Sequence, residues 1–137
     1  DLAALRKLRD DDASGVLKEY FGDGEDPRQW KQHWGVVPLD VKLYRVTRLQ
    51  VSDCSKLVVL PAAIGGLAAL TELNLRGCSS LATLPDAIGE LGALAKLDLQ
   101  MCSSLTELPA AIGELGALTM LDLYGCSRLA ALPESIG

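Results

Sequence analysis

Residues 67–90 read LAALTELNLRGCSSLATLPDAIGE, and this stretch decides the fold because it recurs along most of the chain. Every copy carries one cysteine at the same place, so the four cysteines are spaced 24 residues apart. Self-similarity at a fixed period of this length is the signature of a repeat architecture. We therefore predict four stacked coils, numbered one to four, at residues 43–66, 67–90, 91–114 and 115–137, the last being one residue short.

Two segments of each copy have different hydrophobic patterns. In coil two, Leu73-Asn74-Leu75 alternates apolar and polar residues, which is typical of a short strand with one buried face. Residues 84–89 contain a proline, which suits the first position of a helix, and end with a glycine, which permits the left-handed turn that stops one. Each copy is thus predicted to form a strand, a turn and a short helix or 3₁₀ segment. The predicted inward residues of coil two are Leu67, Leu70, Leu73, Leu75, Cys78, Leu81, Leu84 and Ile88.

The four cysteines, Cys54, Cys78, Cys102 and Cys126, share one inward position just after the predicted strand. A thiol is a small apolar group and a weak donor, so it suits a buried position beside turn carbonyls. Four equivalent rungs offer no preferred disulfide pairing, and zinc needs ligands that converge rather than a straight column. We expect reduced, buried thiols in a cytoplasmic protein, with disulfides or metal binding as the alternatives.

Residues 1–42 do not follow the period and are predicted to cap coil one, because the exposed edge of a terminal repeat needs a cover. Leucine at every third position of residues 2–8 predicts a short amphipathic helix, and the apolar residues of 16–21 predict a second. We interpret Trp30 and Trp34 as part of this cover. A ligand pocket is the alternative.

Composition and spacing disfavour several classes of function. A net charge of −5 does not suit binding to nucleic acid, and no apolar run is long enough to span a membrane. His33, the only histidine, has no nucleophile or ligand cluster around it. Asp98 and Asp122 should lie roughly 5 Å apart on neighbouring strands, but glycosidases need a cleft around such a pair and calcium needs more oxygen ligands. We expect no catalytic residue, no metal and no cofactor, and no nucleic-acid or membrane partner.

The phrase from Leu73 to Leu81, followed by Leu84-Pro85, resembles the repeats of leucine-rich-repeat proteins, especially intracellular plant-type immune receptors. The recurring Leu-Pro-x-x-Ile-Gly-x-Leu of residues 108–115 is similar to these and to Ras-group repeat proteins, and near-identical cassettes also resemble algal ROCO-type GTPases. Residues 1–42 resemble the N-terminal cap segments of such proteins less specifically.

The resemblance implies an α/β fold, a leucine-rich-repeat solenoid with a right-handed coil. A parallel β-sheet would line its concave face, short helical or 3₁₀ segments its convex face, and a helical cap its N-terminus. The chain contains no Gly-x-x-x-x-Gly-Lys-Ser/Thr phosphate loop, so a receptor or GTPase function could belong only to a longer parent protein.

The outward positions around each strand vary while the core does not, and they are the candidate partner-binding residues. Met101, Met120 and Tyr124 predict an exposed apolar group beside Asp98 and Asp122, as in protein interfaces. A solvated sheet face that only keeps the protein soluble is the alternative. The full candidate set is Arg48, Gln50, Glu72, Asn74, Arg76, Lys96, Asp98, Gln100, Met101, Met120, Asp122 and Tyr124.

Two hypotheses for function follow. In the first, the concave face binds a protein or peptide, as the recognition part of a larger intracellular receptor or GTPase in signalling or innate immunity. In the second, the array is a structural spacer or assembly element that forms a homodimer through its uncapped fourth coil. Variation of the outward columns favours the first, and the truncated fourth coil favours the second.

Overall fold

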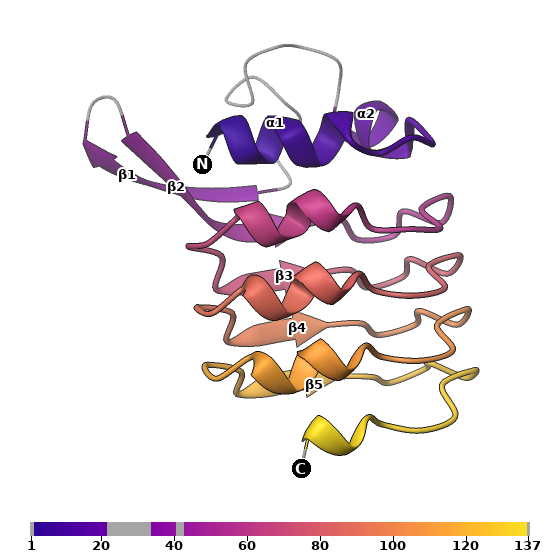
Figure 1. The fold of residues 1–137 in the computed structure, drawn as a ribbon. Coiled ribbons are helices and arrows are strands. Elements are labelled where there is room, and N and C mark those ends of the chain that lie inside the picture. Colours follow the sequence, from indigo (N-terminus) through magenta and orange to yellow (C-terminus); the bar gives the residue numbers. More distant parts are fainter. Residues whose placement is uncertain (1, 22–33, 41–42, 137) are drawn as a thin grey trace.

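In a computed structural model, the structure describes residues 2–21, 34–40 and 43–136. The chain winds into stacked coils, with strands on one side and 3₁₀ segments on the other (Figure 1). The N-terminal helices lie at one end of the stack and the C-terminus at the other (Figure 1). The elements are α1 (Leu2–Asp10), α2 (Val16–Phe21), β1 (Trp34–Asp40), β2 (Leu43–Gln50), η2 (Ala62–Gly66), β3 (Glu72–Asn74), η3 (Asp86–Glu90), β4 (Lys96–Asp98), η4 (Ala110–Glu114), β5 (Met120–Asp122) and η5 (Glu134–Ile136).

The strands form one five-stranded sheet in chain order, β1 to β5. From β2 onward the pairing is parallel, and each residue pairs with the residue 24 positions later, so that Leu49, Leu73, Leu97 and Leu121 form one inward row. The predicted period therefore sets the register of the sheet. The predicted repeat solenoid is confirmed.

The core is a continuous ladder of aliphatic side chains between the sheet and the 3₁₀ segments. All eight predicted inward residues of coil two are buried, as expected. In coil four the equivalent Leu118, Leu121 and Leu123 are only partly buried. Each coil therefore depends on its neighbour to cover its apolar edge.

The 3₁₀ segments begin and end for reasons that differ from the sequence-based expectation. Pro85 is the residue before η3, with an extended ψ of 151°, so the segment begins one residue later than its proline. Gly89 lies inside η3 and has no left-handed backbone conformation. A Cβ added at Gly89 would lie 2.9 Å from the Cβ and the carbonyl oxygen of Ala111. This glycine is therefore needed for the close approach of neighbouring coils, and the prediction that it stops the helix is wrong.

The cap contains the two predicted helices, and α1 packs against η2 and β2. The side chains of Leu5, Leu8, Leu17 and Phe21 join the core of coil one. Asp12 Oδ2 accepts a hydrogen bond from the Leu17 backbone N–H at 2.8 Å, which ties the turn between the helices to the start of α2.

The cap also contains a strand that sequence reasoning missed. Strand β1 pairs antiparallel with β2, with irregular register at two places, so the cap is not purely helical. Residues 34–40 include a glycine and a proline, which weaken any strand signal. Trp30 and His33 lie outside the described residues, so the choice between cover and ligand pocket stays a prediction.

Candidate functional site

The concave surface is built from the outward residues of β2 to β5 and of the turns that follow them. The sheet register places Arg48, Glu72, Lys96 and Met120 in one row, and Gln50, Asn74, Asp98 and Asp122 in the next. Backbone hydrogen bonds from Gly77 N to Gln100 O and from Met101 N to Tyr124 O continue the same alignment past the strands. The predicted candidates therefore lie side by side in rows.

Three residues of the second row stabilise the turns that follow their strands. Asn74 Oδ1 accepts a hydrogen bond from Arg76 N at 2.9 Å, and Asp98 Oδ1 accepts one from Gln100 N at 2.9 Å. Asp122 Oδ1 accepts the equivalent bond from Tyr124 N at 3.0 Å. These local turn bonds were missed, although Asn or Asp before a turn is their usual signal. Because the neutral Asn74 makes the same bond, the negative charge of the two aspartates is not needed for the turn.

The two aspartates lie directly opposite each other on neighbouring parallel strands. Like charges in such a pair are destabilising, by analogy with the unfavourable like-charge pairs across strands. Gln100 Nε2 donates a hydrogen bond to Asp122 Oδ2 at 2.6 Å, which offsets part of this cost. The fold thus carries a local negative charge that its turns do not require.

The positive charges of the concave surface lie mainly on the N-terminal coils. Lys96 Nζ is 3.5 Å from Glu72 Oε1, with both side chains substantially exposed, so this ion pair contributes little to stability. Arg48 and Arg76 are exposed. Among the candidate residues, coils one and two carry two bases and one acid, whereas coils three and four carry one base and two acids.

Exposed apolar side chains cluster on coils three and four. Tyr124 is 75% exposed, Met101 48% and Met120 41%. Met120 and Asp122 are alternate residues of β5, so their side chains project from the same face of the sheet, and Tyr124 lies in the turn that follows this strand. We call Met101, Met120 and Tyr124 the Met–Tyr patch. Exposed apolar groups with polar neighbours are common where proteins bind one another.

The backbone at Met101 adopts a conformation that favours glycine. Its φ is 59°, and the equivalent residues Asp53, Gly77 and Gly125 have φ of 58°, 75° and 77°. A left-handed conformation costs a residue with a Cβ roughly 1–2 kcal/mol, although aspartate tolerates it better. A Cβ added at Gly125 would collide with Met101 Sδ, so the methionine side chain lies against this glycine. Since glycine fills the position in coils two and four, the fold does not demand methionine there.

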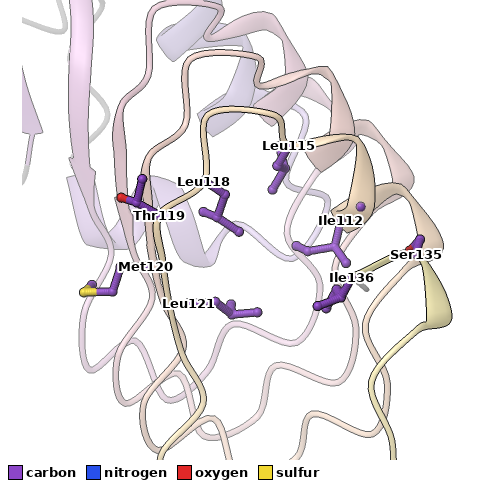
Figure 2. Close-up of a pocket in the computed structure, with 9 residues that line it drawn as sticks. Ile112, Leu115, Leu118, Thr119, Met120, Leu121, Ser135 and Ile136 are labelled. Atoms are coloured by element: carbon purple, nitrogen blue, oxygen red, sulfur yellow. The ribbon is translucent and has the colours of Figure 1, made fainter.

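A cavity of about 230 Å³ lies beside Met120 and is lined by residues of η4, β5 and η5 and of the segment between η4 and β5. Leu118, Leu121 and Ile136 point into it, whereas Met120 projects from the outer side of the strand (Figure 2). Leu94 and Leu97, the equivalents of Leu118 and Leu121, are fully buried in coil three. Sequence analysis predicted an uncapped fourth coil but not a cavity.

The four cysteines are unpaired in this structure, and the column that they form faces the core. Three thiols donate to carbonyl oxygens of the preceding coil: Cys78 Sγ to Val51 O at 2.9 Å, Cys102 Sγ to Leu75 O at 3.2 Å, and Cys126 Sγ to Leu99 O at 3.0 Å. Burial raises the pKa of Cys78 and Cys102 to about 12. Cys126 is only half-buried, where full burial was predicted. These thiols fill the core and do not provide nucleophiles.

Within residues 2–21, 34–40 and 43–136, no group of three or more His, Cys, Asp or Glu side chains is arranged to hold a metal ion. In the same part of the chain, no helix has the length and apolar character needed to cross a membrane.

Comparison with known proteins agrees with the geometry. The sequence model of the Leucine Rich Repeat family matches residues 69–91. The leucine-rich-repeat domain of the type III effector XopL superposes with a TM-score of 0.58 at 37% identity, covering 66% of this chain and 30% of that one. This chain is a leucine-rich-repeat protein. Its membership is shown at the level of the superfamily, and the narrower resemblances to plant, Ras-group and algal proteins are not confirmed.

Two further solved structures are similar to this leucine-rich-repeat protein. A leucine-rich-repeat protein of Leptospira interrogans has a TM-score of 0.51 at 41% identity, over 59% of this chain and 20% of that one. The leucine-rich-repeat ectodomain of the receptor kinase SOBIR1 from Arabidopsis thaliana has a TM-score of 0.55 at 21% identity, over 91% of this chain and 66% of that one. The last likeness concerns the fold alone. A comparison with curated protein sequences gives no significant match.

Leucine-rich-repeat domains are generally protein-interaction scaffolds. The chain spans less than a third of the first two structures, so the activities of those whole proteins do not transfer to it.

Proposed function

We propose that this protein is a recognition module whose concave surface, at coils three and four, binds an extended segment of another protein. The observation that carries the proposal is the exposure of Met101, Met120 and Tyr124 on the coils that also carry the opposed Asp98 and Asp122. Apolar anchors around a polar contact give both affinity and orientation in protein interfaces.

The negative charges of Asp98 and Asp122 favour a partner that carries a positively charged residue. Asp98 and Asp122 carry negative charge that the turns do not require, since Asn74 forms the same turn bond. A lysine or arginine of the partner would relieve their mutual repulsion. In an extended segment, side chains two residues apart face the same way. The matching partner therefore carries a cationic residue with apolar residues two positions before and after it.

The wider setting is part of the proposal. We place the module in a cytoplasmic protein, because its four thiols are unpaired. We further propose that it is the recognition part of a larger receptor or GTPase in signalling or innate immunity, on the strength of the repeat resemblance. In this proposal any catalysis belongs to the larger protein.

The experiment is an equilibrium titration of a fluorescein-labelled peptide with the core Leu-Ser-Arg-Ser-Leu, followed by anisotropy. We expect saturable binding that weakens at least about tenfold with Met120→Ser plus Tyr124→Ser. Asp98→Asn plus Asp122→Asn should weaken it by a smaller factor while keeping the turns. Glu90→Gln plus Glu114→Gln removes two exposed charges from the 3₁₀ side and is the matched control.

Two results would contradict this function. One is binding that weakens equally in the Glu90 and Glu114 variant, because that would indicate attraction between net charges alone. The other is equal binding of the control peptide Leu-Ser-Glu-Ser-Leu, because Asp98 and Asp122 should repel its glutamate.

A second candidate function is self-association through coil four. Leu132 and Ile136 are exposed, and Ile136 borders the 230 Å³ cavity. Within the described residues β5 pairs only with β4, so its other edge offers backbone groups to a further strand. Two copies joined by a two-fold axis through this face would bury these residues.

Sedimentation of the 137-residue chain tests this candidate. We expect the weight-average mass to rise toward that of a dimer with concentration, and Leu132→Glu plus Ile136→Glu to abolish the rise. A monomer over the whole concentration range would contradict self-association and leave the recognition proposal unaffected.

A further inference from the structure

The sulfur atoms of this protein are divided between two environments. The chain has two methionines and four cysteines. Both methionines lie on the concave surface, with Met101 48% and Met120 41% exposed. The cysteines face the core, where three of the four thiols donate hydrogen bonds to carbonyl oxygens. The two thioethers are therefore more accessible than the thiols to an oxidant dissolved in water.

The positions of the two methionines are independent of core packing. Met120 projects from the outer side of β5, away from the leucines that point inward (Figure 2). Met101 has a left-handed backbone conformation that Gly77 and Gly125 adopt at the equivalent positions. Each thioether can thus change its chemistry without a change in the core.

The reactivity of the two sulfur types also differs. Thiol oxidation by peroxide proceeds through the thiolate, and burial holds the pKa of Cys78 and Cys102 near 12, so these groups stay protonated at neutral pH. Burial also raises the pKa of Cys54 and Cys126. A thioether has no proton to lose, so exposure governs its oxidation to the sulfoxide.

We propose that Met101 and Met120 are an oxidative modification site, at which hydrogen peroxide forms methionine sulfoxide in the folded protein while the four cysteines stay reduced. At each site the sulfur lone pair attacks one peroxide oxygen, an S–O bond forms and the O–O bond breaks. The sulfur loses two electrons, the peroxide gains them, and the second oxygen leaves as water. Each methionine thus gains one oxygen atom per peroxide consumed.

The modification would switch off recognition by the Met–Tyr patch. A sulfoxide replaces a soft apolar surface with a polar acceptor, which a partner's apolar side chain would have to desolvate. This consequence rests on the proposed function, whereas the modification itself does not. Methionine sulfoxide reductases would restore the thioethers and, with them, the patch.

The modification is tested on the 137-residue chain with dilute hydrogen peroxide at neutral pH. Mass spectrometry should show a gain of two oxygen atoms, and cleavage after Glu107 and Glu114 separates the peptides of the two methionines. After denaturation all four cysteines should still react with iodoacetamide. Met101→Leu plus Met120→Leu should gain no oxygen. Oxidation at least about tenfold slower in the folded than in the urea-unfolded chain, or oxygen on cysteine before methionine, would overturn the site.

The switch is tested with the fluorescein-labelled Leu-Ser-Arg-Ser-Leu peptide. The oxidised protein should bind it at least about tenfold more weakly, as Met101→Gln plus Met120→Gln should, and reductase treatment should restore binding. Unchanged binding of the doubly oxidised protein would overturn the switch. Failure of the unoxidised protein to bind this peptide would refute the proposed function and, with it, the switch, while the mass assay decides the modification site independently.

Discussion

The two faces of the sheet differ in how closely they follow the repeat. On the inner face, Leu73, Leu97 and Leu121 are identical and each packs into the core. On the outer face the preceding residues of the same strands, Glu72, Lys96 and Met120, differ in charge and polarity. Adjacent residues of one strand thus differ: one is constant and packs into the core, and the next is variable and lies on the outer face. Repetition therefore marks the residues that build the fold, and departure from repetition marks the residues available for recognition.

The largest expected effect comes from placing a charge on the inner face. Cys102→Asp should lower the free energy of unfolding by about 3–5 kcal/mol, because the carboxylate would be buried without a partner. Cys102→Asn should cost less, since a neutral amide can still donate to Leu75 O. Urea denaturation measures both.

The matched outer-face control for that prediction is Met101→Asp, one residue away. Asp53 already adopts the same left-handed conformation in coil one, so this change should alter stability by less than about 0.5 kcal/mol. If Cys102→Asp and Met101→Asp lowered the free energy of unfolding equally, the distinction between the two faces would be refuted.

A smaller loss of stability is expected when a core leucine is truncated. Leu97→Ala should lower the free energy of unfolding by about 2–4 kcal/mol, because Leu97 is fully buried between coils two and four. Lys96→Ala, the preceding residue on the outer face, should change it by at most about 0.5 kcal/mol, since its ion pair with Glu72 is exposed. The midpoint of urea unfolding distinguishes the two, and a cost for Lys96→Ala similar to that for Leu97→Ala would contradict the account.

The sequence predicted the inner face almost completely. A period of 24 residues fixed the strand register, the buried ladder and the inward cysteines, because each coil repeats the same contacts. The period also aligned the outer columns. It could not supply their hydrogen bonds, because the turn bonds of Asn74, Asp98 and Asp122 depend on the backbone conformation after each strand.

The misses lie where contacts between distant segments decide the structure. Strand β1 exists because β2 offers it an edge to pair with, which residues 34–40 alone do not indicate. Gly89 is small because Ala111 of the next coil approaches its backbone, not because its own φ is positive. In both places tertiary packing overrides the local rule.

A third prediction concerns alkaline pH. The ordinary thiol pKa is 9.0, and burial raises the pKa of Cys78 and Cys102 to about 12 in the folded protein. Between these values the unfolded chain loses the thiol protons while the folded chain keeps them. The contribution of these two thiols to the free energy of unfolding is therefore fully present below about pH 9 and falls as the pH rises toward about 12.

Urea unfolding midpoints measured between about pH 8 and about pH 11 should show this decline. The variant Cys78→Ser plus Cys102→Ser should have a shallower decline in the same range. An identical slope in the variant would show that other groups cause the pH dependence.

The most direct test of the central claim removes the Met–Tyr patch while leaving the inner face intact. The variant Met101→Gly, Met120→Ser, Tyr124→Ser should unfold within about 1 kcal/mol of the parent chain, because all three side chains are exposed and glycine suits the backbone at position 101. Its binding to the Leu-Ser-Arg-Ser-Leu peptide should fall at least about tenfold. Stability and affinity measured on this one variant therefore decide the account: unchanged stability with lost binding is the predicted result, and retained binding or a large loss of stability would contradict it.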